Sequence, residues 1–500
     1  GSSPSDTVTL HVSTFYRLPG LPGSVHTHVS FYFTMPTAPR AAAVACLLAA
    51  GLVPASAVLS QVGASRLAEA RRSAPGLYTI PLHQERAPIK RAGKVVSHKT
   101  TYSGTIHVGS PVPQEFSVVF DTGSAHLIFP AAECRTEACL RRRRYNMTAS
   151  STGKAVKLSG QPVRAGELTD QVSIGFGTGK VVGETVREEV CLGPAAEPGP
   201  CVRASAVVAT SMSGSSFDEL NFDGIFGLGL SSLALSKAFS IFDVLVASGQ
   251  LAHPYFSVFL ARDATGRSSE IAIGGHSERH RLTPFSWVPT VKPELGYWQV
   301  AIASIRVNGE ELDVCQDGTC SGILDSGSSH LGLPSSHFAA LDGLLARPAW
   351  STSEDCRDAD SPTLELELSG VNLTLYPRDY MRPLPLSTSV MKRSAGTMPN
   401  AEQYCRAKLM PMNWPPPIGP KAFILGEVVL QRYYTAYDWS GPRAGFALAD
   451  QEGVAPRVPV AAATEPPRWP HPSDEIMLVQ VTVSIGRGGG TRWLSGAPGR

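Results

Sequence analysis

Charge, helical periodicity and long apolar runs are all scarce in this sequence. Charged residues make up 17% of the 500 positions, and 44 basic against 42 acidic residues leave a formal charge of +2. This near balance gives no electrostatic reason to expect a nucleic acid as a partner. Helical spacing of apolar residues is limited, and the best short candidates are residues 236–248 and 335–347.

Metal-ligand spacing is missing as well. No histidine lies at ligand spacing near the cysteine pairs, so a metal site is not expected and no cofactor is predicted. An aromatic-rich platform of the kind that binds sugars is not evident either. Glycine and proline, in contrast, are abundant, with 47 and 40 residues, which suits a turn-rich, mainly β protein of two or three domains.

Residues 35–57 have the features of a secretory signal peptide. Arg40 supplies a charged start, residues 41–53 form a short apolar run, and the segment ends in Ala55-Ser-Ala57. The run is too short to span a bilayer comfortably, so no stable membrane span is predicted in the mature chain. A signal anchor is the alternative. Residues 1–34 are interpreted as an upstream extension that is not part of the fold.

The nine cysteines agree with secretion. Cys46 lies in the predicted signal peptide, and an even set of eight remains. Local pairs on a secreted chain predict four disulfides: Cys134 with Cys139, Cys191 with Cys201, Cys315 with Cys320, and Cys356 with Cys405. Asn146 and Asn372 begin Asn-x-Thr triplets and are predicted glycosylation acceptors, although such triplets also arise by chance.

Two segments flank the central region. Residues 58–96 hold seven basic residues against two acidic ones, which favours a basic propeptide that pairs with carboxylates; an exposed arm is the alternative. Residues 77–82 have a strand pattern, and this strand could belong to the sheet of the mature protein. The sequence therefore does not place the cleavage point that ends the propeptide. Residues 450–500 form a Pro/Gly-rich tail that is predicted to be disordered, apart from a possible stray strand at residues 476–485.

One fifteen-residue segment occurs twice. Residues 116–130 and 320–334 align without gaps and are identical at 7 of 15 positions. Each copy is centred on an aspartate, Asp121 in the first and Asp325 in the second. The repeat therefore places one Asp-(Thr/Ser)-Gly-Ser turn in each half of the chain.

The repeat continues downstream. An apolar-apolar-Gly run ends at Gly227, 106 residues after the first aspartate, and another ends at Gly426, 101 residues after the second. Two near-equal halves of this kind indicate a duplicated lobe. The predicted lobes are residues 97–287 and 288–449.

The chemistry of these turns suits a pair of carboxylates. Gly123 and Gly327 lack a Cβ, so the backbone can fold tightly and offer its N–H to a carboxylate oxygen. The neighbouring hydroxyls are predicted to support the pair: Ser124 and Ser328 by donating to the outer oxygens, Thr122 and Ser326 by bonding across to the opposite lobe. Two carboxylates this close share one proton. One can then activate a water while the other protonates a carbonyl oxygen.

The sequence resembles the pepsin-like aspartic proteases over about residues 100–449. The motifs that carry the resemblance are Tyr102-Ser-Gly-Thr-Ile, Val119-Phe-Asp-Thr-Gly-Ser124, Phe176-Gly-Thr-Gly179, Phe222-Asp-Gly-Ile-Phe-Gly-Leu228, Ile323-Leu-Asp-Ser-Gly-Ser328 and Ile424-Leu-Gly-Glu-Val-Val-Leu-Gln-Arg-Tyr-Tyr434. The resemblance implies a mainly β, bilobed fold of two β-barrel-like sheets, with an active-site cleft between the lobes. It also implies that Asp121 and Asp325 are the catalytic pair of a monomeric endopeptidase that binds polypeptide substrates and pepstatin-like inhibitors.

The hairpin that closes over substrate departs from this family. Its residues are Phe176, Gly177 and Thr178, and the family usually has Tyr in place of the Phe. Ile128 stands where the family usually has the Trp that bonds to that Tyr. Both partners of one hydrogen bond are absent together, so we interpret the change as a coordinated apolar variant that leaves no buried polar group unpaired. The alternative is that Phe176 is only a core residue of the hairpin.

The pocket beside the pair is expected to be apolar. The residues that match family positions lining it are Val119, Phe176, Phe217, Phe222 and Ile225. They imply a preference for bulky apolar residues near the scissile bond. Taken singly, a residue of this kind is more often an ordinary core residue.

Two further features have alternative interpretations. His126 and His330 lie five residues past each aspartate, where they either titrate and shift the pH optimum or simply hydrogen-bond near the pair. Residues 141–144 are four arginines, which form either a processing site or a solvated basic loop.

The sequence thus predicts an acid-favoured aspartic endopeptidase made as a secretory precursor, secreted or delivered to an endolysosomal or vacuolar compartment. A binding or inhibitor protein of the same fold without turnover is the alternative, but such a protein is expected to lose an aspartate or a turn glycine. A two-carboxylate glycosidase is a third possibility, which the Asp-Thr-Gly turn disfavours. A statine-type transition-state mimic would bind tightly only to a working aspartic protease.

Overall fold

The computed structural model describes residues 8–13, 28–33, 76–91, 94–164, 167–177, 179–194, 198–213, 217, 220–262, 265–387, 403–451, 478–487 and 490–493. The chain divides into two compact units, Gly1–Arg72 and Ser73–Arg500. In the first unit, β1 (Val8–Ser13) and β2 (His28–Phe33) form an antiparallel pair. The predicted signal peptide lies outside the described residues.

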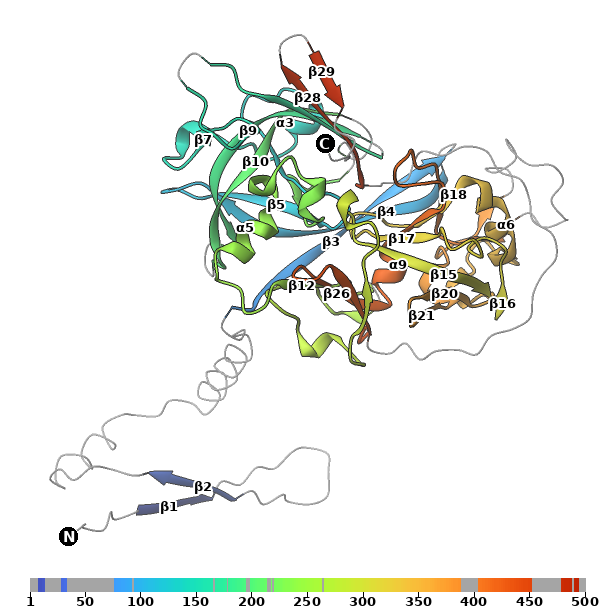
Figure 1. Ribbon diagram of the computed structural model, residues 1–500. Coiled ribbons are helices and arrows are strands. Elements are labelled where there is room, and N and C mark those ends of the chain that lie inside the picture. The colour runs from blue at the N-terminus through green and yellow to red at the C-terminus, as the bar shows by residue number, and fades with distance from the viewer. Residues whose placement is uncertain are drawn as a thin grey trace. The chain divides into compact units, whose positions relative to one another are not determined.

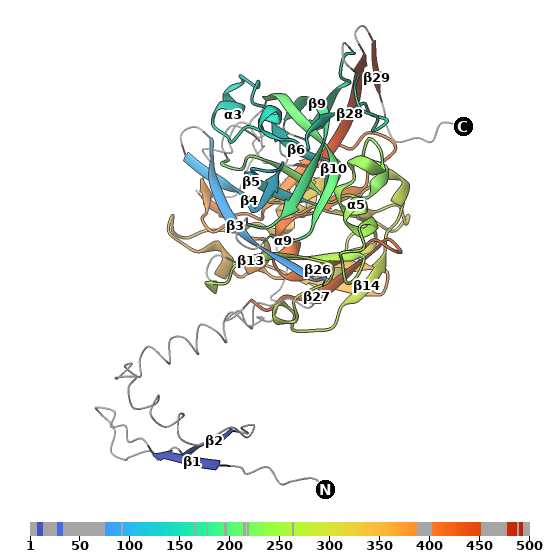
Figure 2. The ribbon, with the colours of Figure 1, turned by 90° about the vertical axis from the view of Figure 1, so that its left-hand side faces the viewer.

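The second unit is mainly β and contains a sixteen-stranded sheet. Its strands, in spatial order, are β14 (Ser286–Pro289), β27 (Arg443–Leu448), β26 (Tyr433–Asp438), β12 (Tyr255–Phe259), β13 (Ser269–Ile273), β3 (Tyr78–Arg91), β4 (Lys94–Val108), β5 (Gln114–Asp121), β11 (Gly224–Gly227), β6 (Leu127–Pro130), β10 (Cys201–Ser213), β9 (Lys180–Leu192), β8 (Gln171–Phe176), β28 (Gln480–Arg487) and β29 (Gly490–Trp493), with β7 (Lys154–Ala155) beside β9. Figures 1 and 2 show β28 and β29 at one margin of this sheet, near β9.

The other strands of this unit form an eight-stranded and a three-stranded sheet. The larger one contains β21 (Val371–Leu375), β20 (Leu364–Leu368), β15 (Gln299–Val307), β17 (Ser321–Leu324), β25 (Ala422–Leu425), β18 (Leu331–Pro334) and β24 (Leu409–Met412), with β16 (Glu310–Glu311) beside β15. The smaller one contains β19 (Arg347–Pro348), β23 (Gln403–Cys405) and β22 (Leu386–Ser387).

Helices are short wherever the structure describes the chain. They include α3 (Glu137–Leu140), α5 (Ile241–Ala247), α6 (Ser335–Leu345), α7 (Pro377–Tyr380) and α9 (Glu427–Leu430). The two helices predicted from sequence are confirmed, because α5 and α6 fall within the expected ranges. Among the described residues, none of the helices combines the length and the apolar character needed to cross a membrane.

The sequence repeat is reproduced by a repeated arrangement of three strands. In the first half β5 runs parallel to β11, which is antiparallel to β6. In the second half β17 runs parallel to β25, which is antiparallel to β18. The register pairs Gly227 with Asp121, and the corresponding β17–β25 pairing ends at Leu324, directly before Asp325. Each aspartate therefore emerges at the end of a buried strand that a second buried strand holds in place.

The sequence halves do not divide cleanly between the sheets. β26 and β27 come from the end of the predicted second lobe, yet β26 pairs with β12 of the predicted first lobe in the sixteen-stranded sheet. The strand β3 falls within the predicted propeptide and pairs with both β13 and β4. Ile80 and Leu82 of β3 are buried in the core. The sequence pattern did not decide whether this strand belongs to the propeptide or to the mature sheet. In the structure it is part of the sixteen-stranded sheet (Figure 1).

The tail differs in part from the predicted disorder. Residues 478–487 and 490–493 are described, and β28 pairs antiparallel with β8 and with β29. This strand falls within the stretch that carried a weak strand pattern. It forms here because β8 would otherwise present an unpaired edge, and a strand of the same chain supplies the missing backbone partners.

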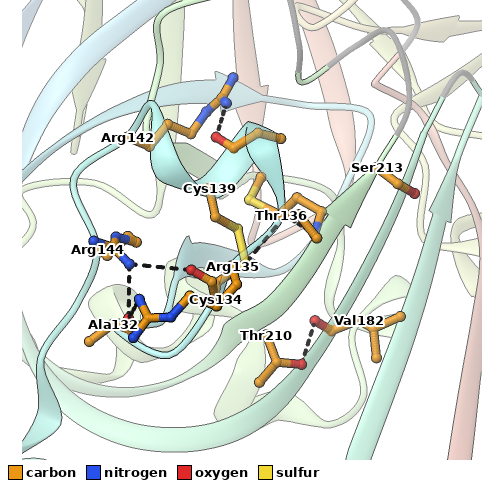
Figure 3. Close-up of a disulfide and its surroundings, with 12 residues drawn as sticks. Ala132, Cys134, Arg135, Thr136, Cys139, Arg142, Arg144, Val182, Thr210 and Ser213 are labelled. Atoms are coloured by element: carbon orange, nitrogen blue, oxygen red, sulfur yellow. Dashed lines mark hydrogen bonds between the residues drawn. A yellow bond between two sulfur atoms is a disulfide. The ribbon is translucent and has the colours of Figure 1, made fainter.

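The four predicted disulfides are confirmed: Cys134–Cys139, Cys191–Cys201, Cys315–Cys320 and Cys356–Cys405. Figure 3 shows the first of these beside Arg142 and Arg144. Asn146 and Asn372 are both exposed, which is compatible with glycosylation, although their modification stays a prediction.

Arg142, the second of the four consecutive arginines, is neither solvated nor accessible to a processing protease. The guanidinium of Arg142 is buried and donates to four backbone carbonyls, those of Ala138, Phe217, Leu220 and Phe222. Arg144 donates to the carbonyls of the disulfide loop. A protease would need to unfold this segment to bind Arg142, because a buried guanidinium with satisfied donors is costly to extract.

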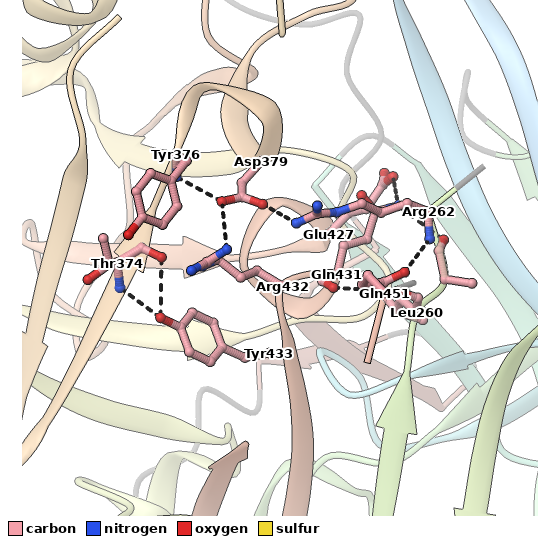
Figure 4. Close-up of polar contacts among 11 residues, drawn as sticks. Leu260, Arg262, Thr374, Tyr376, Asp379, Glu427, Gln431, Arg432, Tyr433 and Gln451 are labelled. Carbon is pink, nitrogen blue, oxygen red and sulfur yellow. Dashed lines mark hydrogen bonds and ion pairs between the residues drawn. The ribbon is translucent and has the colours of Figure 1, made fainter. Parts of the chain in front are cut away.

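A network of polar side chains surrounds Asp379 and Gln431 (Figure 4). Asp379 pairs with Arg262 and, at 3.6 Å, with Arg432. Gln431 donates to Glu427 at 2.8 Å and to the hydroxyl of Tyr102 at 2.9 Å. These bonds connect α7 to Arg262, in the loop between β12 and β13, and connect Gln431, directly after α9, to Tyr102 of β4, so they hold the segment that follows Gly426 in place.

Candidate active site

Asp121 lies at the end of β5 and is completely buried. The backbone N–H of Gly123 donates to its Oδ1 at 2.9 Å, and the hydroxyl of Ser124 donates to its Oδ2 at 2.5 Å. Both carboxylate oxygens therefore have a donor from the same turn. These contacts fix the orientation of the carboxyl group.

Asp325 directly follows β17 and has the same surroundings. Gly327 donates its N–H to Oδ1 at 2.8 Å, and Ser328 donates its hydroxyl to Oδ2 at 2.5 Å. The two turns are thus chemical copies of each other. The predicted supporting contacts of both glycines and both serines are present.

Each carboxylate packs over the glycine of the opposite turn. A Cβ placed on Gly123 would lie 2.7 Å from Oδ1 of Asp325, and one on Gly327 would lie 2.6 Å from Oδ1 of Asp121. Real Cβ atoms essentially never approach other atoms that closely. Only glycine allows the two carboxyl groups to reach each other, which explains the residue type at both positions.

Thr122 and Ser326 hydrogen-bond across the two halves. The Thr122 N–H donates to Oγ of Ser326, and the Ser326 N–H donates to Oγ1 of Thr122, both at 3.0 Å. Each hydroxyl in turn donates to a backbone carbonyl of the other half, that of Leu324 at 2.8 Å or Phe120 at 2.7 Å. All groups in this set are buried and paired, so the spacing of the two aspartates is fixed by a closed network.

The environment of the pair favours one retained proton. Burial, followed by the charge of Asp325, holds the pKa of Asp121 well above its usual value. Burial also raises the pKa of Asp325, against the opposing effect of its hydrogen-bond donors. Two buried carboxyl groups in contact cannot both ionise easily, so they titrate as a unit that shares a proton.

The predicted flap is a hairpin of β8 and β9. Phe176 is the last residue of β8, is only 5% exposed, and donates its N–H to the carbonyl of Gly179 at 2.8 Å. Gly177 follows it, and Thr178 lies outside the described residues. The Phe176 ring meets Phe217 edge-on at 5.8 Å between centroids. Ile128 belongs to the same apolar cluster, so both departures from the family pattern lie in one apolar region.

The residues predicted to line the apolar pocket beside the two aspartates lie together in the structure. One apolar cluster contains all five: Val119, Phe176, Phe217, Phe222 and Ile225. All are buried, and Phe217 also packs edge-on against Phe222. This places a large apolar surface between the flap strand and the strand that leads to Asp121.

The two matched histidines are buried hydrogen-bonding residues. His126 accepts from the backbone N–H of Leu235 at 3.0 Å and contacts the side chain of Gln480 at 2.8 Å. His330 contacts the hydroxyl of Ser97 at 3.1 Å. Burial lowers the pKa of His126 to about 4, and burial also lowers the pKa of His330 well below its usual value. Both rings are therefore neutral through most of the mildly acidic range.

Sequence patterns missed residues that lie directly on the two turns. Tyr297 is buried, and its hydroxyl donates to the carbonyl of Gln480 at 2.5 Å. Leu478 packs against Gly327 and Val479 packs against Gly123. The only available signal was the weak strand pattern in the tail, which gave no indication of where that strand docks. No group of three or more metal-ligating side chains is found among the residues that the structure describes.

The sequence matches the family model for eukaryotic aspartyl protease over residues 101–449. Cathepsin E of Mus musculus is 31% identical over 362 residues, which cover 72% of this chain and 80% of that protein. Cathepsin E-A of Xenopus laevis is 30% identical over 354 residues, covering 69% of this chain and 79% of the relative. Gastricsin of Cavia porcellus is 32% identical over 353 residues, covering 70% and 80%.

Proposed function

The chain belongs to the eukaryotic aspartyl protease family and is an aspartic-type endopeptidase, and from this premise we propose that Asp121 and Asp325 are its catalytic pair. The ionised carboxylate accepts a proton from a water as the water oxygen attacks the peptide carbonyl carbon. The protonated carboxyl donates its proton to the carbonyl oxygen. The newly protonated carboxyl then gives its proton to the amide nitrogen of the tetrahedral intermediate, while the other carboxylate accepts a proton from one of its hydroxyls; the C–N bond breaks and the pair again holds one proton.

The single observation that supports this proposal most strongly is the crossed packing of the turns. Each carboxylate lies over the glycine of the other turn, so two acids from distant parts of the chain form one buried unit. The raised pKa values of both acids keep a proton in this unit under acidic conditions. Because the reaction needs one acid and one base, activity is favoured where one of the two carboxyls is ionised.

We also propose a preference for bulky apolar residues near the scissile bond. The support is the buried apolar cluster that joins the flap strand to the strand ending at Asp121. An apolar wall gains free energy from each buried carbon of a substrate side chain, about 25 cal/mol for each Å² removed from water. The absence of a flap tyrosine adds to this apolar character.

The route of the protein through the cell is part of the same proposal. A secretory precursor fits four disulfides, two exposed sequons and the signal-peptide pattern at residues 35–57. Delivery outside the cell or to an endolysosomal or vacuolar compartment would supply the acidity that the pair requires. Polypeptide substrates and pepstatin-like inhibitors are the expected ligands of a monomeric enzyme.

The decisive experiment compares wild type with Asp121→Asn and Asp325→Asn on a peptide library from pH 3 to pH 7. We expect each substitution to lower kcat/KM by roughly 10³-fold or more, because either change removes the acid or the base. Asp317→Asn is the matched control, since Asp317 is exposed and pairs only with Lys421 and its own loop. Near-full activity of either catalytic variant would refute the assignment.

A further inference from the structure

Two residues of the tail lie on the two catalytic turns. The Cβ of Leu478 is 2.9 Å from the position of a Cβ on Gly327, and Cγ2 of Val479 is 3.1 Å from the corresponding position on Gly123. Both tail side chains are fully buried. Leu478 thus contacts the second turn and Val479 the first, so two consecutive residues of the tail each contact one of the two turns.

The backbone after this bond is held as an extended peptide. The N–H of Gln480 donates to the carbonyl of Gly123 at 3.0 Å, and the hydroxyl of Tyr297 donates to the carbonyl of Gln480 at 2.5 Å. From Gln480 onward β28 pairs antiparallel with β8, the flap strand. Recognition of this kind, by addition of a strand to an open sheet edge, binds any sequence through its backbone and obtains selectivity from side-chain pockets.

The side chain of Gln480 occupies a site shaped for a carboxamide. Its Nε2 donates to the carbonyl of Leu233 at 3.0 Å, and its Oε1 lies 2.8 Å from Nδ1 of His126. The other ring nitrogen of His126 accepts from the N–H of Leu235, so Nδ1 carries the proton and donates to the glutamine. One donor and one acceptor thus face the two ends of a single amide.

We propose that Leu478, Val479 and Gln480 occupy the substrate-binding site in the register of a substrate, so that the enzyme is inhibited by its own C-terminal segment and favours glutamine at the second position after the scissile bond. This inference rests on the proposed catalytic pair. The substrate class it names is an extended peptide with two apolar residues at the bond, followed by glutamine. A glutamate there would lose the bond to Leu233 and bury a charge beside a neutral ring.

The inhibition is intramolecular because the segment belongs to the same chain. Residues 452–477 join Gln451 to Leu478. A ligand tethered to its own binding site acts at an effective concentration that does not depend on the enzyme concentration. A peptide substrate must therefore displace the segment before it reaches the pair, and dilution of the enzyme will not relieve the inhibition.

The first test uses the full chain with Gln480→Glu or Leu478→Asp and measures kcat/KM on a fluorogenic peptide. We expect each change to raise activity about tenfold or more, since each places an unpaired charge or polar group in a buried site. The same substitutions at exposed positions, Gln161→Glu and Leu168→Asp, are controls and should leave activity unchanged. Unchanged activity in both tail variants would overturn the proposal.

The second test adds a synthetic peptide of residues 476–485 to the Leu478→Asp enzyme. Inhibition by this peptide, or its cleavage between the Leu and Val positions as seen by mass spectrometry, supports the proposed register. The same peptide with Glu at position 480 should act about tenfold more weakly or worse. Equal action of the two peptides would refute the glutamine site, and cleavage at another bond would refute the register.

The two tests also separate this inference from the function it rests on. Peptide hydrolysis that Asp121→Asn abolishes, but that tail substitutions do not alter, leaves the catalytic pair intact and refutes only the tail inhibition. Hydrolysis that is absent from wild type, from both tail variants and from the exposed controls alike refutes the proposed catalytic pair itself.

Discussion

Thr122 and Ser326 are held by a reciprocal pair of hydrogen bonds in which each backbone N–H donates to the hydroxyl of the other residue, both at 3.0 Å. The bond pattern is symmetric although the side chains differ by a methyl group. Since the two residues lie 204 positions apart, this contact converts two separate turns into one rigid site.

Removal of one hydroxyl from this pair should loosen the site. Thr122→Ala leaves the N–H of Ser326 and the carbonyl of Leu324 without partners. We expect a loss of roughly 1–3 kcal/mol in the free energy of unfolding and a lower kcat. Thr122→Ser keeps the hydroxyl and should retain most of both quantities. Equal losses in the two variants, measured by denaturant unfolding, would contradict a role for the hydrogen bonds.

Neutralisation of one of the two proposed catalytic acids should stabilise the fold while it abolishes activity. The folded-state pKa of Asp121 is raised, so the stability that this group contributes is present below its unfolded pKa and is lost as pH rises through the folded value. Asp121→Asn cannot ionise, so the variant does not lose this stability as the pH rises. We expect the variant to gain roughly 1 kcal/mol over wild type near pH 7, and less near pH 3.

The control for this pH effect is Asp317→Asn. The hydrogen bond from Lys421 is the first cause that lowers the pKa of Asp317 to about 2. Its contribution has the opposite sign: it is present above the unfolded pKa and is lost as pH falls through about 2. Thermal unfolding from pH 3 to pH 7 separates the two cases, and a stability gain for Asp121→Asn that does not grow with pH would argue against the raised pKa.

The glycine of the first turn should not tolerate a methyl group. In Gly123→Ala the new Cβ meets the carboxylate of Asp325 and the side chain of Val479. We expect kcat to fall by roughly 10²-fold, because small displacements of reacting groups are that costly. Gly441→Ala is the control, since no atom lies within 4 Å of its added Cβ. Full activity of Gly123→Ala would mean that the two acids are not in close contact.

A hydroxyl on the flap ring should be unfavourable in this apolar setting. Phe176→Tyr places a polar atom next to Phe217, in the apolar cluster that also contains Val119 and Ile128. We expect kcat/KM to fall about 5- to 30-fold, the equivalent of roughly 1–2 kcal/mol for an unpaired buried hydroxyl. Phe176→Leu keeps the site apolar and should be milder. A peptide assay in which the tyrosine variant equals or exceeds wild type would contradict the apolar interpretation.

Local motifs were sufficient to predict the geometry of the two aspartate turns. Asp121 and Asp325 each sit in a short pattern whose strand, glycine and hydroxyl are adjacent in sequence, so their mutual arrangement follows from a single turn. The cysteine pairs were predictable for a similar reason, because most partners are close along the chain. Short-range information also placed both helices.

Contacts between distant segments could not be predicted in this way. The docking of Gln480 beside His126 joins residues 354 positions apart, and the composition of the tail indicated disorder. The pairing of β26 with β12 depends on which sheet edge is open, a property of the folded molecule. Likewise, four consecutive arginines carry no signal that one of them will satisfy four buried carbonyls.

The position of β3 limits how this molecule can be cut during maturation. Because β3 pairs with β13 through residues 78–82 and with β4 through residues 83–91, cleavage between Arg91 and Lys94 would not release the upstream piece. The product would be a nicked, two-chain molecule joined by strand pairing and side-chain packing alone, since Cys46 is the only cysteine upstream of that cut and all the disulfides lie downstream. Such a species would migrate as one band in a native gel and as two in a denaturing gel without reductant.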